Sequence, residues 1–260
     1  MKVGGAVGNA SANVLDELAH RSDFVLVHGG SEEIDRLGSA LGRPPSYYTS
    51  PSGTVSRRCD PAQMETVVLA LAGKVQTSLV AGLGARGARA VGLSGVDGRL
   101  LTARRKTGAR AVVRGKVLRL ADDLAGTVER VDTPLLRGLL GLGVVPVVGP
   151  PAVTEEGLVV NVDADAVAAA VAGALRAEAL VLLTNVPGLL RSVDDPTSVV
   201  PRVPRAEFDA ALALADGRMR KKLLAAHAAQ DAGVGSVVIA PSQVPGPVAR
   251  ALAGGGTVFG

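Results

Sequence analysis

Aromatic side chains and cysteines are scarce in this chain of 260 residues. It contains three Phe, two Tyr and no Trp, and its single cysteine is Cys59. Proteins that bind single-stranded nucleic acid stack the bases on aromatic side chains, so this shortage argues against that class. One cysteine cannot form an internal disulfide or a multi-cysteine zinc site, and a cytoplasmic location is therefore expected.

Histidines and membrane-spanning runs are also lacking. His20, His28 and His227 do not have the spacing of metal ligands, so no protein metal site is predicted. The apolar stretch from Leu135 to Val153 is interrupted by an arginine and three prolines, which argues against a transmembrane helix. The short apolar run at the N-terminus is too weak for a signal peptide. We therefore expect a soluble protein with no membrane anchor.

Aliphatic residues and positive charge are abundant instead. Hydrophobic residues make up 47% of the chain, and its net charge is +4. A core of Val, Leu and Ala suits parallel strands that are buried on both faces. The charge suits an acidic partner, which could be nucleic acid, a nucleotide or an acidic protein. A basic surface without a partner would give the same charge.

Short aliphatic runs alternate with helical patterns along the chain. We expect strands at Phe24–Val27, Ala90–Leu93, Val144–Val148, Ala179–Thr184 and Ser236–Ala240. We expect helices at Ser31–Leu41, about Pro61–Arg86, Thr133–Leu142, Asp163–Arg176 and Arg218–Ala232. This order predicts an α/β fold with a mostly parallel sheet and helices on both faces. The alternating pattern of Arg110–Leu120 predicts an antiparallel hairpin beside that sheet, and Arg43–Asp60 predicts a surface loop or hairpin.

Glycine pairs follow two of the expected strands. Lys2-Val3-Gly4-Gly5 opens the chain, and His28-Gly29-Gly30-Ser31 follows the next strand. Backbone N–H groups at such strand ends can hold an anion, and ligands of parallel sheets bind at this edge. The chain lacks the Walker phosphate loop, the G-x-G-x-x-G dinucleotide motif and the G-x-S-x-G hydrolase elbow. The pattern therefore favours an anion site outside those three classes.

Eight ordered segments carry a resemblance to a known family. They are KVGG (2–5), VHGGS (27–31), VSRRCD (55–60), AGKV (72–75), GLSGVDGRLLTARRK (92–106), NVDAD (161–165), LTNVPGLL (183–190) and GRMRKK (217–222). In this order and spacing the chain resembles the amino acid kinase family. Within that family it is most similar to the N-acetylglutamate kinase branch, in particular to kinases of aminoadipate or glutamate bound to a LysW-type amino-group carrier protein.

The resemblance implies a three-layer αβα sandwich that phosphorylates a carboxylate with ATP and Mg²⁺, giving an acyl phosphate. It implies one domain over residues 1–260. An N-terminal lobe of about 1–150 would hold the acyl substrate and the dimer contact, and a C-terminal lobe of about 151–260 would hold the nucleotide. The partners it implies are a second copy of the chain and an acidic carrier protein, with neither nucleic acid nor membrane.

The resemblance also implies roles for individual residues. Lys2 and Lys222 bind the phosphates, and Asp165 orients both lysines. Gly4, Gly5, Gly29 and Gly30 supply backbone donors around the transferred group. Arg57 and Asn161, with Gly29 and Gly30, hold the acyl substrate. The residues expected against the nucleotide are Lys2, Gly4, Thr184, Asn185, Gly188, Leu189, Met219 and Lys222.

Carboxylate chemistry suits this set of residues. A carboxylate with a reference pKa of about 4.3 is already ionised at neutral pH, so the reaction needs no general base. It needs two anions held together and positive charge on the transferred phosphoryl group, which lysines and backbone N–H groups provide. We expect Mg²⁺ to be bound mainly by phosphate oxygens and water, and we assign it no protein ligand.

Each of these charged residues could also have an ordinary structural role. Asp165 could be a helix first-turn acid, Lys222 belongs to a basic run, and Arg57 stands beside Arg58, either of which could face solvent. Since only Met1 precedes Lys2, the central strand is shortened or the native start lies upstream. A non-catalytic sensor of the same fold is a further alternative, although the presence of Lys2, Asp165 and Lys222 together argues against it.

The substrate is also left open between two candidates. Free N-acetylglutamate would need the same catalytic centre as a carrier-bound amino acid. Three features favour the carrier: the Tyr47–Arg57 loop, Ser31 in place of a third glycine, and a basic region near the hairpin. We expect this basic region to comprise Arg99, Arg104, Arg105, Lys106, Arg110, Arg114, Lys116 and Arg119. Aminoadipate and glutamate differ by one methylene, which the sequence does not resolve.

Overall fold

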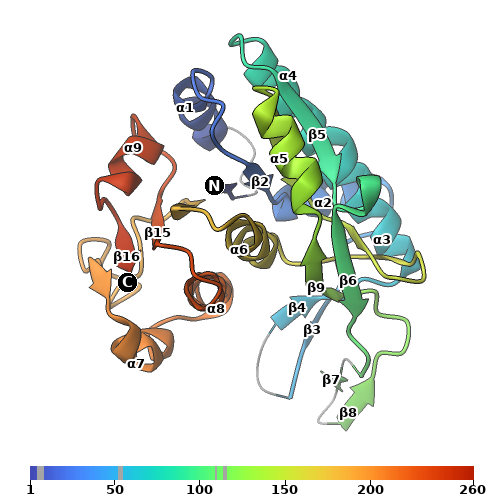
Figure 1. Ribbon diagram of the computed structural model, residues 1–260. Helices are drawn as coiled ribbons and strands as arrows, with labels where there is room; N and C mark the ends of the chain where they lie inside the picture. Colours follow the sequence, from blue (N-terminus) through green and yellow to red (C-terminus); the bar gives the residue numbers. More distant parts are fainter. Residues whose placement is uncertain (5–8, 52–54, 109, 114–115) are drawn as a thin grey trace.

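The main sheet of the protein has eight strands. The structure, a computed structural model, describes residues 1–4, 9–51, 55–108, 110–113 and 116–260. The strand order is β14 (Arg202–Val203), β16 (Thr257–Phe259), β15 (Ser236–Pro241), β13 (Ala179–Thr184), β1 (Lys2–Val3), β2 (Leu26–His28), β10 (Val145–Gly149) and β5 (Ala90–Ser94). All neighbours pair in parallel except β15 and β16. The predicted mostly parallel sheet is therefore confirmed (Figure 1).

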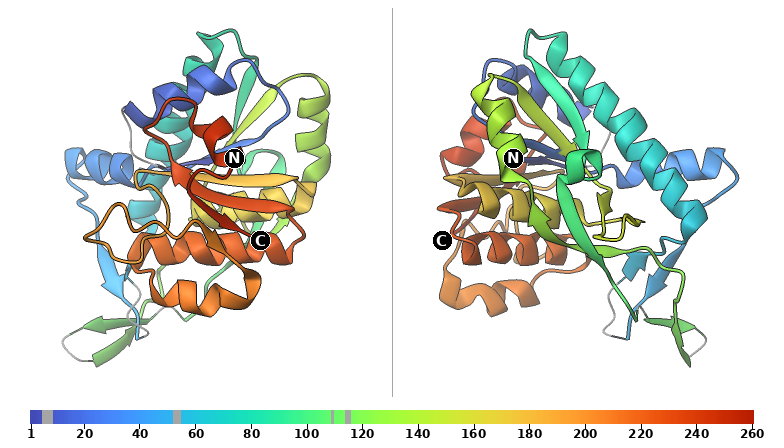
Figure 2. Two further views of the ribbon diagram at one scale, coloured as in Figure 1. Left: turned by 90° about the vertical axis from the view of Figure 1, so that its left-hand side faces the viewer. Right: turned by 45° about the vertical axis from the view of Figure 1, so that its right-hand side comes forward.

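Helices cover both faces of this sheet. One face carries α5 (Thr133–Gly141), α6 (Ala164–Leu175), α7 (Phe208–Ala213) and α8 (Gly217–Asp231). The other carries α1 (Asn9–Leu18), α2 (Ser31–Ala40), the α3–α4 helix and α9 (Pro247–Leu252). The five strands and five helices expected from the sequence all occur within a few residues of their predicted bounds. The two views of Figure 2 show the resulting three layers.

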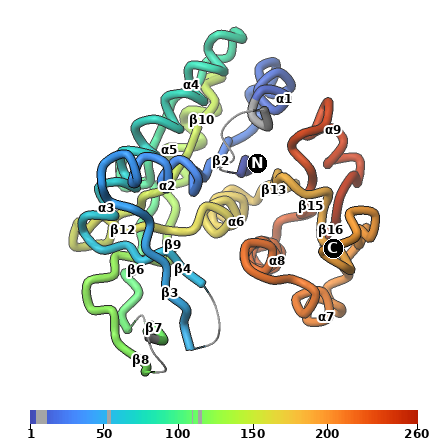
Figure 3. The backbone as a smooth tube through the Cα atoms, turned by 180° about the vertical axis from the view of Figure 1, so that it is seen from behind, coloured from blue at the N-terminus to red at the C-terminus, as the bar shows by residue number. Residues whose placement is uncertain are grey.

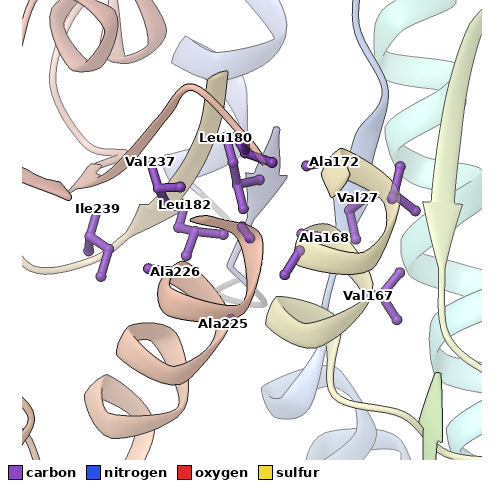
Figure 4. Close-up of a cluster of buried hydrophobic side chains, with 14 of the residues drawn as sticks. Val27, Val167, Ala168, Ala172, Leu180, Leu182, Ala225, Ala226, Val237 and Ile239 are labelled. Atoms are coloured by element: carbon purple, nitrogen blue, oxygen red, sulfur yellow. The ribbon is translucent and has the colours of Figure 1, made fainter. Parts of the chain in front are cut away.

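Alternate residues of the strands fill two separate cores. Val25 and Val27 of the β2 segment belong to the core beneath α6 and α8, whereas Leu26 belongs to the core beneath α1 and α4. Figure 4 shows the first core, where Leu180 and Leu182 lie between α8 and α6. Small alanines on these two helices let them pack closely on the sheet. The aliphatic composition thus results from strands that are buried on both faces.

Three smaller sheets lie outside the main one. A four-stranded sheet joins β12 (Val159–Val160), β11 (Ala152–Val153), β6 (Leu101–Arg105) and β9 (Gly126–Val131), and the sequence did not predict it. In the segment where a loop or hairpin was expected, β3 (Tyr47–Thr49) pairs antiparallel with β4 (Val55–Arg57). In the segment of the predicted hairpin, β7 (Arg110–Val113) pairs antiparallel with β8 (Lys116–Arg119).

The position predicted for the second hairpin was wrong. Strands β7 and β8 make a sheet of their own and pair with no strand of the main sheet in the described residues, and β7 contacts β3. Figure 3, drawn from behind, shows the two hairpins together at one end of the molecule. The reason is that β6 and β9, on either side of the hairpin, belong to the four-stranded sheet and carry it away from the main one.

A long helix runs along the outer side of the sheet from Pro61 to Gly84. It consists of α3 (Pro61–Val68), the π-helix η1 (Leu69–Val75) and α4 (Gln76–Gly84). By length and composition alone it could cross a membrane. Its buried side chains, however, pack into the core beneath α1 and α2, as those of a core helix do. The right-hand view of Figure 2 shows it along one edge of the molecule.

Candidate active site

The candidate site lies at the carboxyl edge of the central strands. Strand β1 pairs on one side with β13 and on the other with β2, with Val3 opposite both Leu183 and His28. The residues that follow these strands, Gly4, Gly29 and Thr184, therefore reach the same edge. This is where ligands of open parallel sheets bind, and it is the edge that the glycine pairs predicted.

Two lysines and one aspartate meet at this edge, and we call them the lysine cluster. Lys2 Nζ lies 2.9 Å from Asp165 Oδ1. Lys222 Nζ donates to Asp165 Oδ1 at 3.1 Å and to Oδ2 at 2.9 Å. All three side chains are at least nine-tenths buried. Residues from β1, α6 and α8, which lie far apart along the chain, thus form one ionic group.

The hydrogen bonds of Asp163 bear on whether Asp165 serves the helix start or the two lysines. The Asp163 side chain caps α6 by accepting hydrogen bonds from the backbone N–H groups of Asp165 (2.9 Å) and Ala166 (3.2 Å). The capping role is therefore filled. Asp165, in the first turn of the same helix, directs its carboxylate toward the two lysines instead. The structure thus brings Lys2, Asp165 and Lys222 together as the resemblance implied.

Burial and charge act in opposite directions on this cluster. Burial would raise the pKa of Asp165, but the charges of Lys2 and Lys222 outweigh it and hold that pKa below its ordinary value. Burial, together with the charge of Lys2, lowers the pKa of Lys222 despite the opposing effect of Asp165. With two ammonium groups and one carboxylate, the cluster carries a net positive charge in a buried place. Binding of an anion would neutralise this charge.

The backbone N–H groups of the described glycines differ in their hydrogen bonding. Gly4 N–H donates to Leu183 O (3.2 Å) and Gly29 N–H donates to Val3 O (3.3 Å), so both groups are engaged in the sheet. Within the described residues, Gly30 N–H has no acceptor. The parallel ladder thus extends one residue past β1 and β2, and the roles of Gly4 and Gly29 as backbone donors stay predictions. The role of Gly30 stays a prediction too, and Gly5 lies outside the described residues.

The long helix leaves little space for a side chain at Gly30. It is buried at the start of α2, and a Cβ there would lie 2.5 Å from Leu71 Cδ2 and 3.0 Å from Val75 Cγ2. Both contacts come from the π-helical part of the long helix. The extra residue of a π-helix places these side chains directly over the strand end. A larger residue at position 30 would push this part of the site open.

Arg57 lies beside the start of α2, within a group that we call the arginine cluster: Arg57, Asp35, Tyr47 and Ser31. Its Nη1 lies 2.6 Å from Asp35 Oδ1. Its Nη2 donates to Tyr47 Oη at 2.9 Å and to Ser31 Oγ at 3.1 Å. Tyr47 Oη in turn donates to the Asp35 carboxylate at 3.0 Å, and the guanidinium lies 5.0 Å from the centre of the Tyr47 ring.

Arg57 and its neighbour Arg58 have different environments. The Arg57 side chain is 9% exposed, whereas Arg58 reaches outward to a surface ion pair with Asp122. Ser31 directly follows Gly30, so the Arg57 guanidinium lies next to the glycine pair. Of the two neighbouring arginines, Arg57 is thus the one at the candidate site.

Asn161 is joined to the same region through Cys59. Asn161 Nδ2 donates to Cys59 Sγ at 3.2 Å, and the Asn161 backbone bonds to Leu124 and Gly126. Cys59 is fully buried, and burial raises the pKa of its thiol to about 11. A thiol with this pKa is not a nucleophile at neutral pH. Cys59 therefore has a structural contact with a predicted substrate residue and no reactivity of its own.

Comparison with known proteins identifies the family. Residues 1–241 match the amino acid kinase family. The chain belongs to the amino acid kinase family. A protein named [LysW]-aminoadipate kinase from Deinococcus radiodurans is 46% identical over 99% of this chain and 90% of its own length. One of the same name from Thermus thermophilus is 45% identical, over 99% and 98% respectively. An acetylglutamate kinase from Methanopyrus kandleri is 40% identical over 92% of this chain and 93% of its own length.

Solved structures of the amino acid kinase fold agree with this assignment. An N-acetylglutamate synthase from Neisseria gonorrhoeae, in complex with coenzyme A and N-acetyl-glutamate, has a TM-score of 0.79 at 27% identity, and the match covers 99% of this chain and 58% of that one. Carbamate kinase from Giardia lamblia bound to AMP-PNP has a TM-score of 0.67 at 15% identity, over 99% and 96%. The predicted fold class is therefore confirmed, and the similar proteins found in the sequence comparison are named as kinases.

Apart from Lys2, Gly4 and Lys222, the residues predicted to contact the nucleotide lie at or just after the end of β13 or at the start of α8. Thr184 ends β13, and its carbonyl accepts from Ser242 N at 2.8 Å. Asn185, the next residue, is exposed. Gly188 is tightly packed, since a Cβ there would lie 2.6 Å from Thr257 Oγ1. The turn that follows β13 therefore packs against Thr257 of β16.

Leu189 and Met219 differ from the others in where their side chains lie. Leu189 is 1% exposed and its side chain is in the core, while its N–H donates to Thr257 Oγ1 at 2.8 Å. Met219, in the first turn of α8, packs partly buried against the same core. Leu189 thus anchors the turn to the core through its side chain. Met219 keeps an exposed part beside it.

The predicted basic region of this amino acid kinase is not one patch. Arg99 pairs with Glu155 at 3.1 Å, and Arg104 pairs with Glu129 at 2.6 Å. Arg105 donates to the backbone oxygens of Asp123 and Ala121. These three arginines are therefore occupied within the four-stranded sheet and its loops. The remaining basic residues of the region are exposed, namely Lys106, Arg110, Lys116 and Arg119, while Arg114 lies outside the described residues.

Sequence reasoning missed Asp35, although a signal for it exists. Ser31 and Asp35 are four residues apart in α2, so both face the same direction, toward Arg57. The contact of Tyr47 with Arg57 was equally missed, since the sequence indicates the Tyr47–Arg57 loop only as a recognition feature. Within the described residues, no group of three or more His, Cys, Asp or Glu side chains is placed to hold a metal ion.

Proposed function

We propose that this amino acid kinase transfers the γ-phosphoryl group of ATP to the side-chain carboxylate of an acidic amino acid whose α-amino group is blocked. The observation that carries the proposal is the buried lysine cluster, which lies at the same edge of the sheet as Gly30. A net positive, buried group at the same sheet edge as a backbone N–H that has no acceptor among the described residues suits an anion whose charge grows during the reaction. The product is an acyl phosphate.

The lysines and the glycine act on different parts of the reaction. Lys2 and Lys222 neutralise the phosphate oxygens, and Asp165 keeps their two ammonium groups charged and in place. Gly30 N–H donates to the transferred group. The attacking carboxylate is ionised at neutral pH and needs no base. Most of the rate enhancement then comes from holding two mutually repelling anions in line.

The residues present fit a magnesium ion that is bound through the nucleotide. Both Asp165 oxygens contact lysine ammonium groups and are not free as ligands. Mg²⁺ in kinases is commonly held by phosphate oxygens and water with few protein ligands. When bound, it would supply further positive charge to the phosphates. The direct contacts with the transferred group are left to Lys2, Lys222 and Gly30.

For the amino acid, we propose aminoadipate or glutamate attached to an acidic carrier protein. Support comes from the relatives named [LysW]-aminoadipate kinase at 45% and 46% identity over nearly the whole chain. Arg57 would bind the free carboxylate of the amino acid, with Asn161 beside it. The relative named acetylglutamate kinase, at 40% identity, supports free N-acetylglutamate as the second candidate.

The two hairpins offer a surface for such a carrier, which we call the hairpin surface. Arg110, Lys116 and Arg119 are exposed on β7 and β8. Exposed apolar side chains lie on both hairpins: Tyr47 and Val55 on β3 and β4, and Val112, Val117 and Leu118 on β7 and β8. Because β3 contacts β7, this surface is continuous with Tyr47 and, through it, with Arg57. A mixed basic and apolar face suits an acidic protein partner.

The test runs both substrates side by side. Hydroxylamine traps an acyl phosphate as a hydroxamate, so kcat/KM can be measured for the charged carrier protein and for N-acetylglutamate. We expect a much higher kcat/KM with the carrier. Equal or higher kcat/KM with N-acetylglutamate would favour the second candidate, and no hydroxamate from either substrate would overturn the proposed function.

Charge reversal then separates docking from chemistry. The double variant Lys116→Glu/Arg119→Glu should raise KM for the carrier-bound substrate while leaving kinetics with N-acetylglutamate unchanged. Arg250→Glu is the matched control, because Arg250 is exposed at the end of α9, away from the hairpins. The docking surface would be refuted if the double variant and the control behaved alike with the carrier.

We also propose a homodimer and a division of labour within the chain. Strand β5 ends the main sheet, and the long helix beside it exposes the apolar side chains of Val68 and Leu69. Such a face suits a second copy of the chain. A monomeric mass in light scattering would refute the dimer.

We further propose that residues of about 1–150 bind the acyl substrate and that residues of about 151–260 bind the nucleotide. A cytoplasmic location suits an enzyme that uses ATP.

A further inference from the structure

His28 is fully buried at the end of β2, immediately before the glycine pair. Its ring packs against β10, where a Cβ at Gly149 would overlap it. The mechanism above gives His28 no reacting atom to contact. A buried imidazole nevertheless costs free energy unless both ring nitrogens find partners. The partners of these two nitrogens therefore indicate what the side chain does.

One partner is Gln76, the first residue of α4. Hydrogen bonding assigns the orientation of its buried amide: the nitrogen donates to Leu93 O at 3.2 Å, and the oxygen accepts from Leu93 N at 3.0 Å. The amide atom nearest His28 lies 3.4 Å from Nε2, and in this orientation that atom is the nitrogen. An amide nitrogen is only a donor, so His28 Nε2 must be the acceptor.

The other partner is the carbonyl of Gly29. A neutral imidazole whose Nε2 accepts carries its proton on Nδ1. His28 Nδ1 lies 3.4 Å from Gly29 O, so the Nδ1–H group donates to that oxygen. Burial lowers the pKa of His28, and the charge of Lys2 acts in the same direction. The ring is thus neutral and restricted to one tautomer.

Holding Gly29 O fixes the direction of Gly30 N–H. The two groups belong to one planar peptide unit and point to opposite sides of it. On either side, Gly29 N–H is bound to Val3 O (3.3 Å) and Gly30 O accepts from Ile34 N (2.9 Å). Glycine has no side chain to limit rotation of the unit between them. The His28 contact is the further restraint on this peptide.

We propose that His28 and Gln76 are positioning residues, which hold the Gly29–Gly30 peptide so that Gly30 N–H faces the transferred phosphoryl group. The peptide's role rests on the proposed function, whereas the tautomer does not. Gln76 selects the tautomer, His28 anchors the carbonyl, and the opposite end of the peptide is presented to the site. The same amide also pairs with the backbone of β5, which ties the restraint to the rigid sheet.

The first experiment reads the tautomer directly. Nitrogen-15 NMR of histidine-labelled protein distinguishes Nδ1–H, Nε2–H and doubly protonated rings, and the signals of His28 are those that vanish in His28→Asn. We expect the Nδ1–H tautomer at neutral pH. The Nε2–H tautomer or a protonated ring would overturn the proposal. This measurement needs no activity, so it stands even if neither substrate is phosphorylated.

The second experiment separates positioning from packing. In His28→Asn the amide nitrogen takes the place of Nδ1, whereas His28→Leu keeps the bulk without a donor. We expect kcat to fall about 100-fold in His28→Leu, the usual scale for losing one such donor, with KM for ATP little changed. His28→Asn should recover most of this loss. His20→Leu, at an exposed site, is the control.

Two results would contradict this role. One is a His28→Leu enzyme that retains full kcat. The other is a His28→Asn enzyme no better than His28→Leu at equal thermal stability. Gln76→Met adds a third arm: it should lower kcat and reduce the Nδ1–H population together. Loss of kcat with an unchanged tautomer would remove Gln76 from the proposal.

Discussion

Two charged clusters lie at the same edge of the sheet, and they are balanced differently. The lysine cluster sets two ammonium groups against one buried carboxylate. The arginine cluster sets one guanidinium against one carboxylate and adds the hydroxyls of Tyr47 and Ser31. The first is incomplete without an anion, whereas the second is neutral by itself. The difference indicates that the lysine cluster binds charge and the arginine cluster fixes the shape of the substrate site.

Asp165→Asn should have the largest effect of the substitutions in these two clusters. It leaves two ammonium groups buried without a counter-charge, and removing one partner of a buried ion pair costs about 3–5 kcal/mol. We expect a large fall in the unfolding temperature and near loss of kcat. Adding Lys222→Met returns the cluster to the net charge of the native protein. The double variant should therefore regain stability while staying inactive, and failure to regain it would show that charge is not the cause.

Lys222→Ala should remove activity without removing stability. The variant leaves Lys2 and Asp165 as a balanced pair, so the unfolding temperature should change little. Loss of one preorganised donor to the transferred group should lower kcat by about 10²–10³-fold. The matched control is Arg250→Ala, which deletes an exposed positive charge. If Lys222→Ala and the control had the same kcat, Lys222 would not belong to the site.

High pH should affect the lysine cluster before other lysines. Burial and the neighbouring Lys2 lower the pKa of Lys222 from 10.5. Lys222 is charged below its pKa and neutral above it, so its contribution is lost at a lower pH than an ordinary lysine would show. We expect kcat/KM for ATP to fall about tenfold per pH unit on this alkaline limb. Lys222→Arg should move the limb to higher pH, and a limb that stays in place would contradict the assignment.

Arg57→Lys tests the geometry of the second cluster while keeping its charge. A lysine cannot reproduce the planar fork that meets Asp35, Tyr47 and Ser31 at once. We expect KM for the amino-acid substrate to rise about tenfold, on the scale of a lost charged hydrogen bond, with kcat and KM for ATP nearly unchanged. A loss confined to kcat would instead indicate that Arg57 acts on the phosphoryl group.

Tyr47→Phe should have the smallest effect. It keeps the ring under the guanidinium but removes the hydroxyl that accepts from Arg57 and donates to Asp35. We expect KM for the amino-acid substrate to rise about threefold, because Tyr47 is 47% exposed and water can replace its hydroxyl. Thr49→Val, which removes an exposed hydroxyl of the same hairpin outside the arginine cluster, is the control. Equal effects of the two changes would argue against the hydroxyl network.

Five strands of the central sheet could be predicted from the sequence because each is a continuous aliphatic run between helices. Strands β14 and β16 were missed, since they have only two and three residues. The lysine cluster could be predicted through the family motifs, and the placement of its three residues agrees with them. The motifs could not show that Gly4 and Gly29 donate to the sheet, since hydrogen bonds of a parallel ladder depend on register. Register is set by neighbouring strands that are distant in sequence.

Other parts of the site were beyond sequence reasoning for a similar reason. Asp35, Gln76 and His28 act through contacts between elements, and none of them belongs to a local motif of charged residues. The four-stranded sheet was missed because β11 and β12 have two residues each, too few to show a period. This sheet is also the reason why Arg99 and Arg104 are paired internally and do not join the hairpin surface.

One measurement tests the central claim that the lysine cluster serves phosphoryl transfer to a carboxylate. ADP and trapped hydroxamate are quantified together, with ATP and the charged carrier protein, for the native enzyme, Lys222→Ala and Arg250→Ala. The account predicts one hydroxamate for each ADP, with both falling in parallel in Lys222→Ala and neither changing in Arg250→Ala. ADP formed without hydroxamate, on the carrier and on N-acetylglutamate alike, would contradict it.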